Sequence, residues 1–313
     1  MRLTFESVLV TGGAGFIGSH LVDALLDQGL RVYVLDDLSS GSMRNLARSR
    51  KDPKLRFRRN SVTKMKVVAS ICRRVEAVFH LAAVSSAVLS ARRPELANEV
   101  NVTGTLNVLQ AASRNDVQKI IFASSAAVYG NQKSIPISED APLEPINVYG
   151  ASKLAAEEYC QVYGRANDLS TFSLRLFNVY GERQDPRSPY SGVVSIFAEK
   201  LRRKEQVTIF GDGRQTRDFI HVSDVVRANL LALEAEAGGV INVGTGEETS
   251  VRELYDLMAG LMGSGAKPMF GPGRPGDIYR SCADVSKAKA VLGFQPEDDI
   301  RLGLSTMLGL RLL

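Results

Sequence analysis

Residues 7–20 read SVLVTGGAGFIGSH, and this stretch determines how the rest of the chain is interpreted. The apolar residues Val8 to Val10 predict a short strand, and the apolar spacing from Phe16 to Leu26 predicts a helix. Three glycines at three-residue spacing begin at the turn between them: Gly12, Gly15 and Gly18. Glycine permits a positive φ and a close approach of the backbone to a phosphate. Free N–H groups and the positive dipole at the helix start suit a pyrophosphate.

An acidic residue ends the next predicted strand, Arg31 to Leu35. Asp36 follows that strand about twenty residues after the last glycine, where a carboxylate can accept the hydroxyls of an adenosine ribose. No arginine directly follows Asp36 to bind a 2′-phosphate, so NAD is favoured over NADP. Strand, glycine turn, helix and acid together predict dinucleotide binding; the alternative is a similar fold whose turn binds nothing.

Composition indicates an ordinary globular protein. The chain has 313 residues, of which 44% are hydrophobic and 23% charged. Lys and Arg exceed Asp and Glu by 39 to 34, and outside a basic stretch at Arg44 to Arg59 this excess is spread along the chain. We interpret the stretch as a solvated face and not as a nucleic-acid site.

Cysteines and histidines predict neither a disulfide framework nor a metal site. Cys72, Cys160 and Cys282 are far apart and outside any CxxC spacing. The three histidines are scattered, and we assign them to packing and loop hydrogen bonds: His20, His80 and His221. The sequence shows no signal-peptide pattern and no apolar run of about eighteen residues. We therefore expect a cytoplasmic protein without a membrane partner.

The order of predicted elements indicates an α/β fold, a doubly wound parallel sheet with a smaller second domain. Strands are predicted near residues 7, 31, 55, 77, 119 and 170, and they alternate with helices. After Asn178 this rhythm breaks, and the polar stretch RQDPRSPY follows at 183–190. Later elements are predicted at 192–203, 207–210, 223–237, 239–243, 251–262 and 284–292, with the strand 239–243 rejoining the sheet. We expect a dinucleotide-binding domain at 1–177 plus about 218–243, and a discontinuous substrate domain at about 178–217 and 244–313.

A tyrosine and a lysine are spaced for acid–base chemistry. Tyr149 and Lys153 stand four residues apart in a predicted helix, so their side chains share one face. Tyrosine has a solution pKa of about 10, so half-ionisation at neutral pH requires roughly 4 kcal/mol. One cation at about 5 Å with an effective dielectric near 20 supplies roughly 3 kcal/mol. Lys153 and an oxidised nicotinamide together can therefore suffice, although such a pair on an amphipathic helix can also be incidental.

Two serines end the strand predicted from Lys119 to Ala123. Hydroxyls of Ser124 and Ser125 at the carboxyl edge of a sheet are placed to bind a substrate oxygen beside Tyr149, and the alternative role is turn capping. The glycine turn, acid, serine pair and Tyr-x-x-x-Lys pattern occur in that order, which makes coincidence improbable.

Seven motifs occur in the order found in one enzyme family: TGGAGFIGSH, DDLSSG, HLAA, FASSAAVYG, YGASK, RLFNVYG and RDFIHVSDV. Through them nearly the whole chain resembles the extended short-chain dehydrogenases, whose dinucleotide domain is a Rossmann fold. It most resembles the nucleotide-sugar 4-epimerases that interconvert UDP-glucose and UDP-galactose. The motifs are specific for the superfamily but less so for the substrate.

The resemblance implies roles for individual residues. Tyr149 would deprotonate the sugar 4-hydroxyl, Ser125 would bridge to that oxygen with Ser124 beside it, and Lys153 would hold the nicotinamide ribose. Hydride would pass from C4 to NAD⁺ and return to the opposite face of the 4-keto sugar. The implied cofactor-binding residues are Gly12, Gly15, Phe16, Ile17, Gly18, Asp36, Asp37, Ser39, Ser40, Gly41, Ser61, Val62, Leu81, Ala82, Ala83, Asn101, Ser124, Tyr149 and Lys153.

The resemblance also implies how the nucleotide sugar is held. Asn178 would bind the diphosphate with Arg217 and Arg274, the segment from Thr208 to Phe210 would hold the uracil, and Asp277 would bind the uridine ribose. The implied substrate-binding residues are Ser85, Ser86, Ser125, Tyr149, Asn178, Val193, Val194, Thr208, Phe210, Arg217, Arg274, Asp277 and Ser281.

Residues at a few positions distinguish this chain from similar enzymes that catalyse other reactions. Related 4,6-dehydratases and decarboxylases carry an acid just before VYG, whereas this chain has Ala126 and Ala127, and a methyl group cannot transfer a proton. Ser281 would face the C2 substituent of the sugar, and its small size predicts that N-acetylhexosamines are accepted too. Residues 60–62 lack the family's usual aspartate at the adenine, and Leu176 replaces an aromatic found in some epimerases beside the nicotinamide.

The helices predicted at 94–114 and around Tyr149 have more apolar positions than one buried face needs. In the resembling family these helices pair as a four-helix dimer interface; the alternative is that they only cover the sheet. Two further functions stay open: another UDP-sugar enzyme of the superfamily, such as a UDP-glucuronate epimerase or a reductase, and a non-catalytic NAD-binding regulator.

Overall fold

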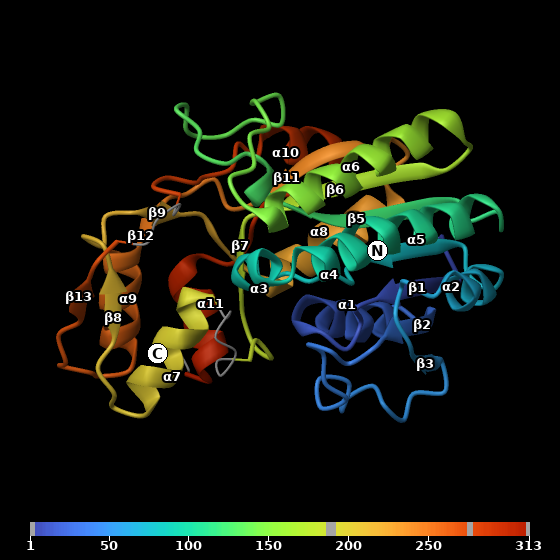
Figure 1. The fold of residues 1–313 in the computed structure, drawn as a ribbon. Helices are drawn as coiled ribbons and strands as arrows, with labels where there is room; N and C mark the ends of the chain where they lie inside the picture. The colour runs from blue at the N-terminus through green and yellow to red at the C-terminus, as the bar shows by residue number, and fades with distance from the viewer. Residues whose placement is uncertain (1–3, 186–191, 274–277, 311–313) are drawn as a thin grey trace.

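A seven-stranded parallel sheet forms the centre of the protein (Figure 1). The computed structural model describes residues 4–185, 192–273 and 278–310. The strand order is β11-β6-β5-β4-β1-β2-β3, and all six pairings are parallel. The strands are β1 (Ser7–Thr11), β2 (Arg31–Asp36), β3 (Leu55–Arg59), β4 (Ala77–His80), β5 (Lys119–Ser125), β6 (Ser170–Leu176) and β11 (Gly239–Val243). The predicted fold class is confirmed, including the return of residues 239–243 to the sheet.

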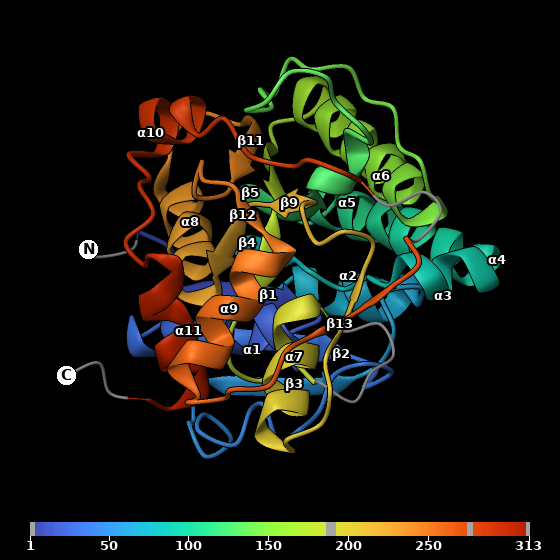
Figure 2. The same cartoon turned by 90° about the vertical axis from the view of Figure 1, so that its left-hand side faces the viewer.

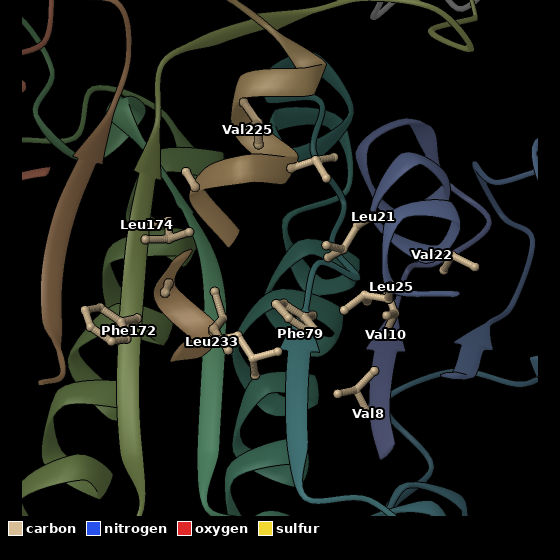
Figure 3. Close-up of a cluster of buried hydrophobic side chains, with 14 of the residues drawn as sticks. Val8, Val10, Leu21, Val22, Leu25, Phe79, Phe172, Leu174, Val225 and Leu233 are labelled. Carbon is tan, nitrogen blue, oxygen red and sulfur yellow. The ribbon is translucent and has the colours of Figure 1, made fainter. Parts of the chain in front are cut away.

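Helices cover both faces of the sheet, which explains why its strands read as continuous apolar runs. Alternate residues of β1 serve different layers: Val8 and Val10 pack under one set of helices and Leu9 under the other. Figure 3 shows side chains of the first layer, among them Leu21 and Val225 from helices and Val10 and Leu174 from strands. This layer contains α1 (Phe16–Asp27), α8 (Val222–Glu234) and α10 (Ser286–Leu292), and the other contains α2 (Met65–Cys72), α5 (Gly104–Ser113) and α6 (Val148–Ala166).

The single helix predicted at 94–114 is wrong in detail. The chain forms α4 (Pro94–Asn98), a π-helical turn η1 (Glu99–Thr103) and then α5, after the short α3 (Ala87–Arg92). The hydroxyl of Thr105 donates to the carbonyl of Asn101 over 2.6 Å. π-turns are frequent at functional sites, and this one aims the Asn101 side chain at the carboxyl edge of the sheet.

A smaller cluster of elements lies at one end of the sheet (Figure 2). Its core joins α7 (Val193–Arg202), α9 (Val251–Leu261) and α11 (Ile300–Leu308). Three short strand pairs accompany them: β7 (Asn178–Tyr180) with β10 (Phe219–His221), β9 (Thr216–Arg217) with β12 (Thr249–Ser250), and β8 (Thr208–Phe210) with β13 (Met269–Gly271). The sequence reading missed α11 and most of these short strands. We keep the predicted domain boundaries at 177, 217 and 243 as a proposal.

A buried histidine joins separate parts of the chain. His221 Nδ1 lies 3.1 Å from Asp298 Oδ2, which precedes α11, and Nε2 lies 3.5 Å from Glu182 Oε2, which follows β7. Contact with His221 lowers the pKa of Glu182 to about 2. Burial disfavours the charged ring of His221, but Glu182 and Asp298 outweigh it and raise the pKa of His221 above its usual range.

Replacing His221 with Gln should therefore destabilise the protein more at pH 5.5 than at pH 9. A histidine with a raised folded-state pKa contributes stability that is complete below its unfolded pKa of about 6.5 and is lost at higher pH. The stability contributed by ionised Glu182 is present above about pH 4.5 and is lost as pH falls through about 2, so Glu182 is ionised at both test pH values. Because Glu182 is partly exposed, we expect a difference of about 1 kcal/mol between the two pH values. Urea unfolding of both proteins measures it, and an equal loss at both pH values would contradict the charged pair.

Candidate active site

The glycine turn has the geometry that close approach to a ligand requires. Gly12 has a φ of +70°, and a Cβ there would lie 2.8 Å from the backbone nitrogen of Ala82, so only glycine fits. Gly15 is the N-cap of α1 and offers no side-chain cap to the first turn, which contains Phe16, Ile17 and Gly18. The N–H groups of that turn are consequently not taken by a capping side chain and can bind a pyrophosphate.

Asp36 lies beside this turn, as predicted for a ribose-binding acid. Its carboxylate accepts hydrogen bonds from the backbone N–H groups of Ala14 (2.9 Å) and Leu38 (2.8 Å). Burial raises the pKa of Asp36, and the two N–H donors act in the opposite direction. Each carboxylate oxygen keeps a further lone pair for a ribose hydroxyl. The residues present therefore fit the adenosine half of a dinucleotide, with the loop that contains Asp37, Ser39, Ser40 and Gly41 next to them.

Tyr149 lies at the start of α6, beside the carboxyl end of β5. The side chain of Asn147 caps this helix by accepting a hydrogen bond from Gly150 N over 2.8 Å. A Cβ on Gly150 would lie 2.5 Å from the carbonyl oxygen of Ala127, so glycine lets the turn after β5 pack directly on α6. Ser125 is thereby placed next to the Tyr149 phenol, and its Oγ accepts from the backbone N–H of Ala127 over 3.2 Å. Burial raises the pKa of Tyr149, and the neighbouring Ser125 hydroxyl lowers it.

Lys153 is buried one helical turn after Tyr149. Its side chain is 3% exposed, and Nζ lies 4.2 Å from the centre of the Phe122 ring. Within the described part of the chain the ammonium makes no hydrogen bond, so its three donors are available to a ligand. Burial lowers the pKa of Lys153 to about 8, and electrostatic interactions with the Cys160 thiol and with Glu157 oppose that shift. A buried ammonium whose N–H groups are not otherwise engaged in the described residues fits the hydroxyls of a nicotinamide ribose.

Ser124 differs from Ser125 in orientation. Its hydroxyl is 3% exposed and donates to Glu157 Oε2 over 2.5 Å. The two predicted hydroxyls therefore face different partners, Ser125 toward Tyr149 and Ser124 toward Glu157. Sequence reasoning missed Glu157 and its ion-pair partner Arg175. A signal for both was present, because a charged residue occupies an apolar strand in SLRL and an acid follows Lys153 at helical spacing.

Polar side chains at the π-turn connect the neighbouring loops. Asn101 bonds with both backbone groups of Val84 and donates to Ser152 Oγ over 2.9 Å. His80 lies between the hydroxyls of Thr11 (2.7 Å) and Thr105 (2.9 Å). Because the Thr105 hydroxyl donates to a carbonyl, we assign the ring proton to Nε2. Burial and the charge of Lys153 lower the pKa of His80 to about 3, so the ring is neutral and structural, as expected from sequence.

The remaining residues predicted for the cofactor lie at the same edge of the sheet. Leu81, Ala82 and Ala83 follow β4, and Val62 is buried after β3. The hydroxyl of Ser61 accepts from the N–H and hydroxyl of Thr63, so it is already engaged within its own turn. Ser85 precedes Ser86, and Ser86 caps α3 by accepting from Leu89 N over 3.0 Å.

The residues predicted for the substrate come from both parts of the fold. Asn178 begins β7 and is exposed, and Ser281 is 5% exposed. Thr208 and Phe210 lie on β8, where Phe210 is 37% exposed, and Arg217 lies on β9. Val193 begins α7, and Val194 next to it is buried in the core, so only its backbone can face a ligand. Arg274 and Asp277 lie outside the described residues.

Two further features are absent from the described ranges. No group of three or more His, Cys, Asp or Glu side chains in residues 4–185, 192–273 and 278–310 is arranged to hold a metal ion. In those same ranges, no helix has the length and apolar character needed to span a bilayer.

Comparisons with known proteins agree with this geometry. The family model described as "NAD dependent epimerase/dehydratase family" matches residues 8–244. A "Putative UDP-glucose 4-epimerase" of Methanocaldococcus jannaschii is 41% identical over 299 residues, 95% of each chain. The crystal structure of a UDP-glucose 4-epimerase with UDP-glucose from Thermotoga maritima is 41% identical, with a TM-score of 0.92 over 97% of each chain.

A second solved structure has a different named substrate. A UDP-N-acetylglucosamine 4-epimerase from Methanobrevibacter ruminantium, in complex with UDP-N-acetylmuramic acid, is 36% identical, with a TM-score of 0.94 over 97% of each chain. The likeness extends over both the sheet and the smaller C-terminal cluster. Together with the family model, which covers most of the chain, it shows that this protein is a member of the NAD dependent epimerase/dehydratase family.

Proposed function

We propose that the protein is an isomerase that inverts C4 of a UDP-hexose, with UDP-glucose and UDP-galactose as its substrates and NAD as its cofactor. One observation carries this proposal: a phenol, Tyr149, lies next to the Ser125 hydroxyl and one helical turn from the buried ammonium of Lys153. The relatives named as UDP-glucose 4-epimerases support the choice of substrate.

The side chains can perform the proton chemistry of this reaction. Lys153 binds the nicotinamide ribose and, as a cation four residues from Tyr149, favours the ionised phenol. Tyr149 removes the proton of the 4-hydroxyl, Ser125 holds the same oxygen, and Tyr149 returns the proton after the sugar has turned over. Bound NAD⁺ would supply the hydride acceptor and donor that oxidation and reduction at C4 require. Inversion would result from hydride return to the opposite face of the 4-keto carbon.

The turn after β5 favours epimerisation over elimination or decarboxylation. A dehydratase must also move a proton at a second carbon, which requires an acid or base beside Tyr149. The 3₁₀ turn η2 (Ala126–Val128) offers methyl groups at Ala126 and Ala127 instead. Because Ala126 and Ala127 can transfer no proton, we propose that the chemistry is oxidation and reduction at C4.

Conversion of UDP-galactose to UDP-glucose tests the proposal directly. Purified protein with catalytic NAD should bring the two sugars to equilibrium, as followed by product chromatography, without accumulation of NADH. Turnover of UDP-glucuronate alone, or stoichiometric NADH, would identify another enzyme of the family. No turnover of any UDP-sugar by protein that binds NAD would favour a regulator.

Replacing Ser281 with Tyr should narrow the substrate range. We propose that the small Ser281 leaves room for an N-acetyl group at C2, and the solved relative named UDP-N-acetylglucosamine 4-epimerase supports this. A buried tyrosine would fill that space, so we expect kcat/KM for UDP-GlcNAc to fall at least about tenfold relative to that for UDP-glucose. Ser281→Ala is the matched control and should keep both activities. An equal loss of kcat/KM for both sugars in Ser281→Tyr would show that Ser281 does not face the C2 substituent.

We further propose that the protein forms a homodimer through α6 and the helices at 94–113. Large apolar side chains are exposed along this side of the molecule, on α3 and α6: Val88, Val148, Tyr159 and Val162. Contact with a second copy would bury them and complete a four-helix arrangement. Sedimentation equilibrium would give twice the chain mass of 34.0 kDa if this is correct.

A cytoplasmic location is proposed from the thiols. Cys72, Cys160 and Cys282 are all buried and free, and burial raises the pKa of Cys72 and Cys160 to about 12. Such unreactive thiols suit a reducing compartment, where NAD and UDP-sugars are used.

A further inference from the structure

A buried carboxylate lies one helical turn beyond Lys153. Glu157 is 0% exposed, and both of its oxygens are engaged. Arg175 on β6 approaches it with Nη2 (2.6 Å from Oε1) and Nε (3.2 Å from each oxygen), and Ser124 donates to Oε2 over 2.5 Å. The carboxylate is thereby fixed in one orientation at the carboxyl ends of β5 and β6.

Arg175 is held from its other side as well. Its Nη1 donates to the hydroxyl of Tyr129 (2.8 Å) and to the carbonyl of Glu139 (2.9 Å), and its guanidinium lies 4.7 Å from the centre of the Tyr129 ring. The Tyr129 hydroxyl donates to Asn242 Oδ1 over 2.6 Å. The position of Arg175 thus depends on several partners besides Glu157.

The charges around Lys153 do not cancel without Glu157. Lys153, Glu157 and Arg175 are each no more than 3% exposed, so two cations share one anion in a dry region. The other titratable groups facing Lys153 are neutral at pH 7: His80 on β4, with a pKa near 3, Cys160 on α6, with a pKa near 12, and Tyr149, whose pKa burial raises. Phe122 contributes only its ring face. Glu157 is therefore the anion that makes a charged Lys153 tolerable there.

We propose that Glu157 is a positioning residue for the reaction: it keeps Lys153 protonated inside the folded protein and, through Lys153, keeps Tyr149 able to accept the substrate proton. Only its last step, the effect of Lys153 on proton transfer by Tyr149, rests on the proposed function. Lys153 stands four residues from Tyr149 and Glu157 stands eight, so loss of the nearer positive charge outweighs loss of the farther negative one.

The first test needs no substrate. The signal of Lys153 in the NAD-saturated protein, labelled with ¹³C at lysine Cε, is identified by its absence in Lys153→Arg and titrated by NMR. In Glu157→Gln its midpoint should fall by one pH unit or more, because a unit charge at about 6 Å and an effective dielectric near 20 shifts a neighbouring pKa by about two units. Glu236→Gln removes an exposed carboxylate and should leave the midpoint unchanged. A midpoint within about 0.3 units of wild type in Glu157→Gln would overturn the proposal.

The second test measures turnover of UDP-galactose. The acid limb of kcat in Glu157→Gln should move up by about one pH unit, and kcat at pH 7 should fall about tenfold, while KM changes less than about threefold. Glu157→Asp should restore part of the activity. A purely structural ion pair would lower the melting temperature and leave the pH profile in place, which would refute the role proposed for Glu157.

A double variant controls for misfolding of Glu157→Gln. Glu157→Gln with Arg175→Gln removes the buried pair together, so no uncompensated guanidinium remains. Because the anion next to Lys153 is still missing, the Lys153 midpoint should stay lowered, and a wild-type midpoint would overturn the inference. Two results together would separate the proposals. If wild-type protein turns over no UDP-sugar and Glu157→Gln still lowers the Lys153 midpoint, the proposed function is refuted and the coupling of Glu157 to Lys153 is established.

Discussion

Replacing Tyr149 with Phe is expected to lower kcat for UDP-galactose by about 10²–10⁴-fold, the usual contribution of a positioned acid–base group. The substitution removes one hydroxyl, the group that lies next to Ser125 and that we propose to exchange the substrate proton. The ring remains, so substrate binding should be preserved and KM should change little. Steady-state rates across pH 6–9 with a coupled assay for UDP-glucose measure the effect.

Tyr159→Phe is the matched control for this prediction. Tyr159 lies on the same helix, is 40% exposed and should tolerate the loss of its hydroxyl with unchanged kcat. Retention of more than about a tenth of wild-type kcat in Tyr149→Phe would show that another group exchanges the proton, and the regulator or a different catalytic arrangement would then have to be considered. Because burial raises the pKa of Tyr149 in the protein without its cofactor, activity should rise with pH until the phenol is ionised.

The first part of the fold could be predicted because its signals are local. Gly12 and Asp36 stand at spacings that a single strand–turn–helix–strand unit imposes, and each has the geometry expected of it. The pairing of Tyr149 with Lys153 follows from helix periodicity in the same way. Seven parallel strands follow from the alternation of apolar runs with helices, since few topologies satisfy that pattern.

What the sequence could not reveal depends on contacts between distant segments. Ser124 and Ser125 are adjacent and chemically identical, yet one faces Glu157 and the other Tyr149, because successive side chains at the end of β5 point in different directions. At the π-turn of residues 99–103, the Asn101 side chain bonds with both backbone groups of Val84 in the loop after β4, a contact that helix propensity cannot anticipate. The short strands of the C-terminal cluster are two or three residues long and carry no usable periodicity.

Those C-terminal segments are joined by one buried carboxylate, Asp218. It is 0% exposed, directly follows Arg217, and accepts four hydrogen bonds. The donors are the N–H and hydroxyl of Thr245 (both 2.7 Å), Gly246 N (3.0 Å) and Ala283 N (3.1 Å). Burial raises the pKa of Asp218 and the four donors oppose that rise. Three segments more than twenty-five residues apart in the chain therefore meet at a single side chain.

Replacing Asp218 with Ala should lower the free energy of unfolding by about 3–5 kcal/mol, because three backbone N–H donors, of which Ala283 N is buried, and a hydroxyl lose their common acceptor. Asp212→Ala is the matched control: Asp212 is exposed and accepts from Arg214 N over 2.9 Å in the same region, so its loss should cost about 1 kcal/mol or less. Urea unfolding at pH 7.5 gives both values. A loss for Asp218→Ala within about 1 kcal/mol of the control would mean that Thr245 and Ala283 hold these segments without the carboxylate. Where the variant stays folded, KM for UDP-galactose should rise more than kcat falls. Arg217 adjoins Asp218, and Ser281 lies two residues before Ala283. Arg217 and Ser281 are both proposed to bind the nucleotide sugar.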